Sequence, residues 1–177
     1  MKVCVFCGSN PGLTKEYATE AGHLGTLLAQ KGHTLIYGGG KVGLMGILAD
    51  SVLQNGGEVI GIIPGFLKER EVGHTGITRL EVVFSMHERK KRMADLTDAF
   101  VALPGGWGTL DELAEILTWK QLGLIHQPIF LINTNQFFDP LLSQLEAMVS
   151  EEFLSPHCHS YLQVCTNVQE FSEQLNT

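Results

Sequence analysis

Residues 34–46, with the sequence TLIYGGGKVGLMG, contain the pattern that decides the fold. The apolar run Thr34–Tyr37 has the length of a strand, and glycines separate it from a stretch with helical spacing. Residues 99–112, AFVALPGGWGTLDE, repeat this arrangement. A glycine turn between a strand and a helix directs backbone N–H groups and the positive end of the helix dipole to one point, which suits a phosphate group.

Segments of strand length and helix length alternate along the rest of the chain. Strands are predicted at residues 3–7, 34–37, 59–63, 80–84, 99–103 and 129–132, and a loop is predicted at 65–79. Helices are predicted from the stripe Tyr17, Ala21, Leu24 and Leu28 to Gly32, from the first glycine loop to Leu53, and at 86–96, 110–122 and 140–149, before a weaker final strand and helix. This alternation predicts an α/β fold, a Rossmann-like doubly wound parallel sheet with helices on both faces, which binds ligands at the carboxyl ends of its strands.

The length and charge of the chain argue against several classes of protein. Its 177 residues predict a single domain over residues 1–177. The 12 Lys and Arg against 19 Asp and Glu give a net charge of −7, which argues against nucleic acid or an anionic membrane as a partner. No run approaches the roughly 18 apolar residues of a membrane span, and the first apolar run is too short for a secretory leader. We therefore expect a soluble, cytoplasmic protein.

The four cysteines allow two interpretations. Cys4 and Cys7 form a C-x-x-C pair that could bind a metal together with the His and Cys residues between 157 and 165. However, Cys4 and Cys7 lie in a β-branched and aromatic stretch, and residues three apart on a strand point to opposite faces. We therefore favour buried cysteines that act as small hydrophobic residues, and we expect no metal site.

The first glycine loop also matches a dinucleotide-binding pattern. Gly38, Gly40 and Gly43 satisfy G-x-G-x-x-G, which would suit a nicotinamide-dependent oxidoreductase. That pattern requires an acidic residue near the end of the next strand, whereas Glu58 stands at the beginning of that strand. Either loop alone could be a tight turn for helix packing, but the two loops together favour a pocket for a nucleotide phosphate.

The second glycine loop is followed by a possible helix cap. Thr109 and Glu112 have the spacing of a capping box, which would make both residues stabilising groups at the helix terminus. The same spacing would also hold the Glu112 carboxylate at the mouth of the helix, beside a phosphosugar bound by the glycines. Both interpretations remain open from the residues alone.

One arginine in the charged segment 86–93 stands on the apolar side of its predicted helix. Arg89 lies at i+3 and i+4 offsets from Met86 and Met93, which form an apolar stripe with Leu96. A buried arginine needs a carboxylate or a phosphate to offset its desolvation, so Arg89 is either half of a structural ion pair or a ligand contact. Lys91 and Arg92 fall off the stripe and are expected in solvent.

Together these motifs resemble one known family. The chain contains CGS at 7–9, YGGG at 37–40, VGLMG at 42–46, MHERK at 86–90 and PGGWGTLDE at 104–112. This combination is similar to the Lonely Guy (LOG) family of cytokinin riboside 5′-monophosphate phosphoribohydrolases, from the beginning of the chain to about Phe138. Trp107 replaces a frequent Tyr, and Asp111 replaces a frequent Glu. Proteins of this family have often been labelled lysine decarboxylases, but no lysine here stands out as an anchor for pyridoxal phosphate.

The resemblance implies a Rossmann-like homodimer that hydrolyses the N-glycosidic bond of AMP or N6-modified AMP without a cofactor. It implies that Arg89 and Glu112 are catalytic and that Glu71 contacts the substrate. The other implied substrate contacts are Gly8, Ser9, Gly38, Gly39, Gly40, Gly43, Met86, Lys90, Gly106, Trp107, Gly108, Thr109, Leu110, Asp111 and Thr118.

We expect Glu112 to stabilise the developing ribose cation and to orient water, while Arg89 holds the phosphate or pairs with Glu112. The alternative is a carrier that binds a phosphorylated ligand without chemistry, similar to the molybdenum-cofactor carriers.

Overall fold

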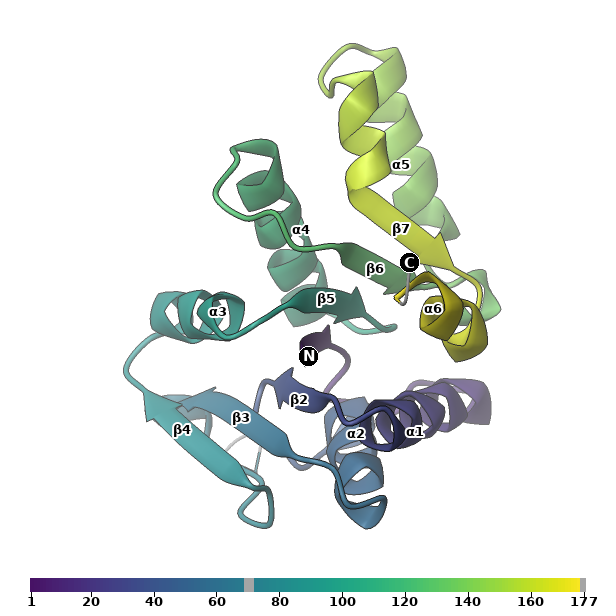
Figure 1. The fold of residues 1–177 in the computed structure, drawn as a ribbon. Helices are drawn as coiled ribbons and strands as arrows, with labels where there is room; N and C mark the ends of the chain where they lie inside the picture. Colours follow the sequence, from purple (N-terminus) through teal and green to yellow (C-terminus); the bar gives the residue numbers. More distant parts are fainter. Residues whose placement is uncertain (69–71, 176–177) are drawn as a thin grey trace.

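The structure is a computed structural model, and it describes residues 1–68 and 72–175. Within these residues, strands and helices alternate from one end of the chain to the other (Figure 1). The elements are β1 (Lys2–Phe6), α1 (Lys15–Gln30), β2 (Thr34–Tyr37), α2 (Gly43–Gln54), β3 (Val59–Pro64), β4 (Arg79–Val83), α3 (Met86–Asp95), β5 (Ala99–Ala102), α4 (Trp107–Gln121), β6 (Ile129–Ile132), α5 (Asp139–Ser150), β7 (Leu162–Cys165) and α6 (Val168–Gln174). Short 3-10 helices cover Gly65–Leu67, Thr134–Gln136 and Pro156–Tyr161.

The strands form one parallel sheet whose order reverses at its centre. The order is β4-β3-β2-β1-β5-β6-β7, and every adjacent pair is parallel. From β1 the chain proceeds outward to β4, then returns to the other side of β1 and proceeds outward to β7. The doubly wound α/β fold is therefore confirmed. In such sheets the crevice beyond the carboxyl ends of the two strands at the reversal, here β1 and β5, is where ligands bind.

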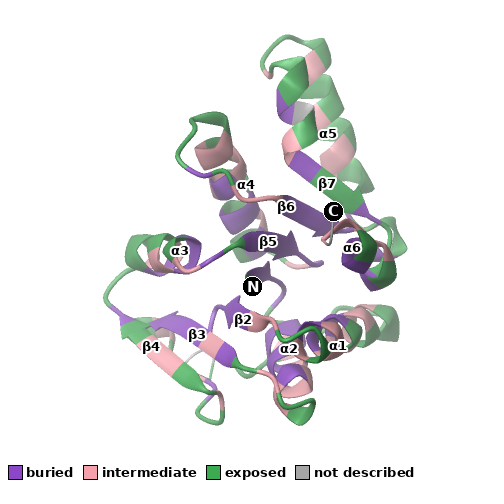
Figure 2. Cartoon of the chain, viewed as in Figure 1, coloured by how far each residue is buried: buried purple, intermediate pink, exposed green. Residues whose placement is uncertain are grey.

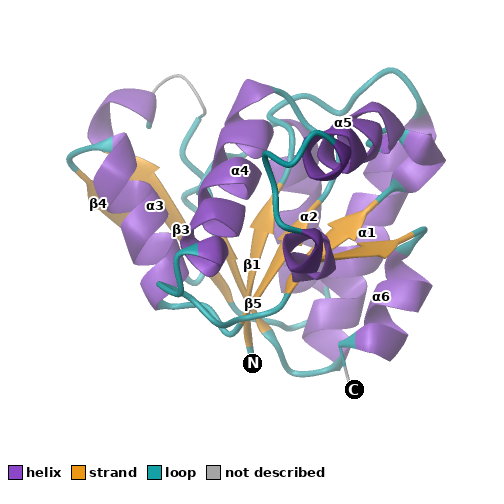
Figure 3. Ribbon diagram, turned by 90° about the horizontal axis from the view of Figure 1, so that it is seen from above, coloured by secondary structure: helices purple, strands orange, loops and turns teal. Residues whose placement is uncertain are grey.

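Helices cover both faces of the sheet, so each face has its own hydrophobic core (Figure 3). One core packs the sheet against α1, α2 and α6, and the other packs it against α3, α4 and α5. The central strands are buried almost completely (Figure 2). Cys4 belongs to one core and Cys7 to the other, which confirms that the two thiols lie on opposite faces of the sheet.

Two predicted boundaries need correction. Residues 65–67 of the expected loop form a 3-10 helix. The helix expected from Leu110 begins instead at Trp107, with Gly106 as its N-cap. Thr109 is therefore the third helical residue, so the predicted capping box is not formed. Of the helices in the described part of the chain, none combines the length and apolar character needed to cross a bilayer.

Candidate active site

Three loops meet where the carboxyl ends of β1, β2 and β5 lie side by side. The Gly8 N–H after β1 donates to the Pro104 carbonyl after β5 over 3.1 Å. The Gly8 carbonyl accepts from the Leu44 N–H at the beginning of α2 over 3.0 Å. Both glycine loops are thus hydrogen-bonded to the loop that follows the central strand, and this junction coincides with the reversal of strand order.

Two glycines allow backbone and side-chain groups to approach one another closely here. Gly43 has φ +61, and a Cβ on it would lie 2.2 Å from the backbone of Ser9. A Cβ on Gly38 would lie 2.0 Å from Nη2 of Arg89. Any larger residue would push the first glycine loop away from Ser9 or from the guanidinium, so both glycines are required by contact geometry.

A cavity of about 190 Å³ opens between these loops, and we call it the glycine-loop cavity. It lies against the ends of β1 and β2 and the first turns of α3 and α4. Its lining residues are Val5, Phe6, Cys7, Gly8, Ser9, Gly38, Met45, Leu67, Met86, Arg89, Gly106, Trp107, Gly108, Thr109 and Glu112. It therefore contains a guanidinium, a carboxylate and the N-terminus of α4.

Arg89 is 4% exposed, which confirms that it faces the protein interior. Its Nε donates to the Ile62 carbonyl at 3.0 Å, and its Nη2 donates to the Gly38 carbonyl at 2.8 Å. Nη1 lies 3.9 Å from Sδ of Met86, one turn earlier on α3. The guanidinium is therefore oriented by a carbonyl of β3 and by the carbonyl that follows β2, while it lines the cavity.

Glu112 is the sixth residue of α4 and is 9% exposed. It lines the glycine-loop cavity together with Arg89. Burial raises the pKa of the Cys7 thiol, and the negative charge of Glu112 raises it further, so Cys7 remains a neutral thiol in the wall. Because α4 begins two residues before Thr109, Glu112 is not a capping carboxylate; it is presented to the cavity from the second turn.

Lys90 does not line the glycine-loop cavity but joins α3 to α4. Its Nζ lies 3.1 Å from a carboxylate oxygen of Asp111 and 3.1 Å from one of Glu115. Burial lowers the pKa of the Lys90 ammonium, but the ion pairs with Glu115 and Asp111 outweigh burial, and the net shift is upward. The Lys90–Asp111 contact thus places two of the residues implied as substrate contacts in an inter-helix ion pair.

The prediction that Arg92 is solvated was only partly right. Its side chain is 41% exposed, and its Nε donates to Glu81 at 2.8 Å. Lys91 is exposed, as predicted, and pairs with Asp95 one turn later. The outer side of α3 is therefore charged and paired.

Other predicted site residues lie in different places. Gly39 and Gly40 are buried in the first glycine loop behind the cavity wall, and Trp107 is 88% exposed at the cavity rim. Glu71 lies outside the described residues. Thr118 donates to the Ala114 carbonyl and lines a second cavity instead.

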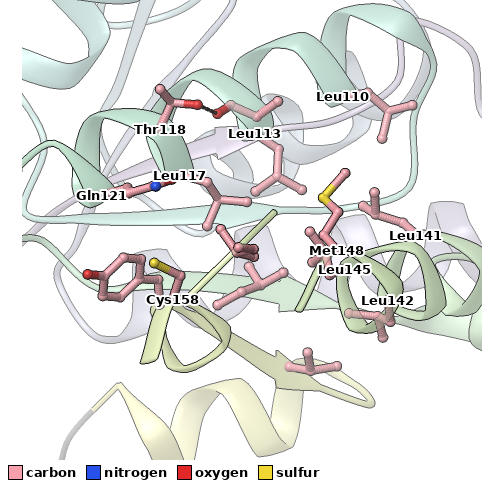
Figure 4. A pocket seen from close by; sticks show the side chains of 15 residues that line it. Leu110, Leu113, Leu117, Thr118, Gln121, Leu141, Leu142, Leu145, Met148 and Cys158 are labelled. Carbon is pink, nitrogen blue, oxygen red and sulfur yellow. Dashed lines mark hydrogen bonds between the residues drawn. The ribbon is translucent and has the colours of Figure 1, made fainter. Parts of the chain in front are cut away.

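That second cavity, which we call the leucine cavity, lies between α4 and α5 and has a volume of about 360 Å³. Figure 4 shows leucine side chains of the two helices directed toward one another across it. Its lining residues are Leu110, Leu113, Ala114, Leu117, Thr118, Gln121, Leu141, Leu142, Leu145, Met148, Leu154, Cys158, Tyr161, Leu162 and Val164. Leu110 and Thr118, both implied as substrate contacts, are therefore separated from Arg89 by the body of α4.

Sequence reasoning missed several cavity residues. Cys7, Met45 and Leu67 line the glycine-loop cavity, although none of them was predicted as a site residue. For Cys7 the available signal was its position directly before Gly8, at the end of the first strand. Leu67 was placed in a loop, and only the 3-10 helix Gly65–Leu67 brings it to the cavity.

Comparison with known proteins identifies the family. The family model described as "Possible lysine decarboxylase" matches residues 45–175. A cytokinin riboside 5′-monophosphate phosphoribohydrolase from Rhodococcoides fascians is 46% identical over 168 residues, which cover 94% of this chain and 85% of that protein. The chain belongs to this family. LOG1 from Arabidopsis thaliana, also named a cytokinin riboside 5′-monophosphate phosphoribohydrolase, is 41% identical over 98% of this chain and 82% of its own length.

A solved structure with a similar fold agrees with the sheet described above. The molybdenum cofactor carrier protein of Chlamydomonas reinhardtii superposes with a TM-score of 0.75, covering 99% of this chain and 95% of that one. Its sequence identity is 20%, so this likeness concerns the fold alone.

Proposed function

We propose that this member of the phosphoribohydrolase family hydrolyses the N-glycosidic bond of adenosine 5′-monophosphates, including N6-modified ones. The products are the free base and ribose 5-phosphate. The observation that carries this proposal is the buried Glu112 carboxylate, which shares the glycine-loop cavity with Arg89 at the reversal of the sheet. The names of the relatives from Rhodococcoides fascians and Arabidopsis thaliana support the same reaction.

We assign the phosphate to the side of the cavity that is formed by the beginning of α4. The net charge of −7 repels an anion at long range, so a phosphate must be bound by local groups. Gly106, Trp107 and Gly108 at the beginning of α4 line the cavity, where the first backbone N–H groups of the helix have no partner within the helix. The Arg89 guanidinium adds positive charge on the α3 side of the cavity.

Glu112 is assigned to the sugar. When the bond between C1′ and the base nitrogen breaks, its electron pair leaves with the base and positive charge develops on the ribose. A carboxylate near C1′ stabilises that cation and accepts a hydrogen bond from the attacking water. The water oxygen forms the new bond to C1′, and one of its protons neutralises the departing base. Because Glu112 is buried, this charge acts in a medium that screens it less than bulk water does.

Arg89 is assigned a double role. Its hydrogen bonds to the Ile62 and Gly38 carbonyls fix the guanidinium plane before any ligand binds. Held in this way, it offsets the negative charge of the phosphate and favours the ionised form of a nearby carboxylate.

A decarboxylase activity, as in the description of the family model, has less support. Decarboxylases that use pyridoxal phosphate hold it through a lysine Schiff base. The lysine of the MHERK segment, Lys90, is instead ion-paired with Asp111 and Glu115 outside the glycine-loop cavity.

We further propose that the chain works as a homodimer whose second copy packs on the leucine cavity. The helix α5 is twelve residues long and has no buried residue, although Leu141, Leu142 and Leu145 lie on its cavity side. In Figure 2 the residues of this helix are exposed or intermediate, and in Figure 1 it projects from the body of the molecule. An exposed apolar groove of this kind is typical of a subunit interface, and a symmetric dimer buries the same patch of both copies.

Incubation with AMP and with isopentenyl-AMP, followed by chromatography for free base, tests the reaction. We expect release of adenine or of the N6-substituted base, together with an equal amount of ribose 5-phosphate. Tight binding of either nucleotide without any release of base would favour the carrier alternative and contradict the hydrolase. The ratio of kcat/KM for the two nucleotides then identifies the preferred substrate.

A further inference from the structure

The segment that follows residue 71 crosses back over the first glycine loop and bonds to its backbone. The Lys41 N–H donates to the Val72 carbonyl at 3.0 Å, and the His74 N–H donates to the Gly39 carbonyl at 2.9 Å. Gly40 and Gly73 face each other as an isolated antiparallel bridge. The conformation of the glycine loop therefore depends on where residues 72–76 are held.

The side chain of His74 connects this segment to α2. It is buried, and its Nε2 lies 2.9 Å from Oδ1 of Asp50 on that helix. Its Nδ1 accepts the Gly76 N–H at 3.2 Å. A backbone N–H can only donate, so Nδ1 carries no proton in this arrangement. The ring proton therefore sits on Nε2 and is donated to the Asp50 carboxylate, a charge-assisted hydrogen bond.

The backbone of this segment needs such an anchor. Val72 has φ +46, in the left-handed region that β-branched residues rarely adopt. A conformation of this kind persists only where the surrounding contacts hold it in place. The Lys41–Val72 bond on one side and the His74–Asp50 bond on the other supply those contacts.

We propose that His74 and Asp50 are positioning residues, which clamp the first glycine loop in the geometry that holds Arg89 for the nucleotide phosphate. The clamp acts at Gly39 and Lys41, directly beside the Gly38 carbonyl that receives Nη2 of Arg89. Displacing the loop would therefore move the Gly38 wall of the cavity and the guanidinium that the Gly38 carbonyl holds. This inference rests on the proposed nucleotide hydrolysis, but the clamp itself can be measured without turnover.

The first test is hydrogen–deuterium exchange on wild type and His74→Ala. The clamp predicts at least tenfold faster exchange at the Lys41 amide and at the amide of residue 74, with little change in the sheet strands. Titration calorimetry with AMP is expected to show roughly tenfold weaker binding in the same variant. In steady-state assays KM should rise more than kcat falls, because the clamp acts on phosphate binding.

Conservative variants separate positioning from general stability. The side chain of His74→Gln can still donate an amide N–H to Asp50. The shorter side chain of His74→Asn cannot reach Asp50 and can only accept a hydrogen bond from the Gly76 N–H. Asp50→Asn still offers an oxygen to Nε2. We therefore expect His74→Gln and Asp50→Asn to retain most of the AMP affinity, and His74→Asn and Asp50→Ala to lose it. If His74→Ala does not fold, the AMP affinities of these four variants test the clamp instead.

Ser51→Ala is the matched control. Ser51 is the next residue on α2, and its hydroxyl donates to the Gly22 carbonyl at 2.7 Å on the α1 side. This variant should lower the melting temperature without changing AMP binding or exchange at Lys41. Wild-type AMP affinity and exchange in folded His74→Ala, or equal losses in Ser51→Ala, would overturn the proposal. If wild type bound AMP but released no base, the hydrolase would fail while the exchange and affinity data still decided the clamp.

Discussion

The glycine-loop cavity and the leucine cavity differ in volume and in the chemical character of their lining. The leucine cavity is the larger, at about 360 Å³ against about 190 Å³, and most of its lining residues are aliphatic. The glycine-loop cavity is smaller but contains a buried guanidinium and a buried carboxylate. Cleaving a glycosidic bond requires charges placed against developing charges, so the smaller cavity suits catalysis. The larger one offers apolar area, which is what association requires.

The largest expected effect comes from the carboxylate of the smaller cavity. Glu112→Gln keeps the size of the side chain but removes its charge, so kcat should fall by about 10²–10⁴-fold while AMP still binds. Glu115→Gln is the matched control on the same helix, because Glu115 pairs with Lys90 outside the cavity. Equal kcat values in the Glu112→Gln and Glu115→Gln variants would contradict the catalytic role of Glu112.

The second effect concerns the arginine. Arg89→Ala leaves the buried carbonyls of Ile62 and Gly38 without their donors, so unfolding free energy should fall by about 3 kcal/mol and activity should disappear. Arg89→Lys keeps the charge but not the planar fork, and we expect a folded enzyme with about 100-fold lower kcat/KM.

Arg92→Gln provides the comparison for Arg89, since Arg92 is half-exposed and pairs with Glu81. Its loss should cost less than about 1 kcal/mol in denaturant melts and leave kcat unchanged. A folded Arg89→Lys enzyme with wild-type kinetics would show that the guanidinium is purely structural.

The third prediction concerns the larger cavity. Leu145→Glu places a charge in the aliphatic lining of the leucine cavity, where a second copy would have to desolvate it. We expect light scattering to show a dimer for wild type and a monomer for this variant at micromolar concentration. Gln144→Glu, a neighbouring exposed position on α5, should leave the dimer intact. An unchanged mass for Leu145→Glu would mean that the second copy, if any, binds elsewhere.

The smallest expected effect lies outside both cavities, on the outer side of α3. The hydrogen bond from Arg92 lowers the pKa of the Glu81 carboxyl below its ordinary 4.5, and burial opposes this only in part. Because the folded-state pKa is the lower one, the pair contributes stability above pH 4.5 and loses it as the pH falls further. Glu81→Gln should therefore be less stable than wild type at pH 7, by no more than about 1 kcal/mol, and the difference should shrink by pH 3.5.

The sheet was predictable because its central strands are buried on both faces. The segments at Thr34–Tyr37 and Ile129–Ile132 are short apolar runs between turn residues, and their predicted bounds match the structure. The beginning of α4 was not predictable in the same way. Gly106, Trp107 and Gly108 have the composition of a loop, yet the helix begins among them, with Thr109 buried in its first turn.

The candidate site was predictable only in part. The burial of Arg89 followed from its place on an apolar stripe, because helical spacing is a local property. Its partners, the carbonyls of Ile62 and Gly38, are 27 and 51 positions away and are brought near only by the sheet order. The same holds for Lys90, whose two carboxylate partners on α4 could not be identified from the sequence. The roles of these residues remain predictions.

The hydrogen bonds that hold Arg89 have a consequence for the entropy of ligand binding. A free arginine side chain loses up to about 2 kcal/mol of conformational entropy when a ligand immobilises it. Here the backbone carbonyls of Ile62 and Gly38 have already imposed that loss during folding. Nucleotide binding at this guanidinium should therefore show a smaller entropic penalty in calorimetry than binding at a surface arginine of equal charge.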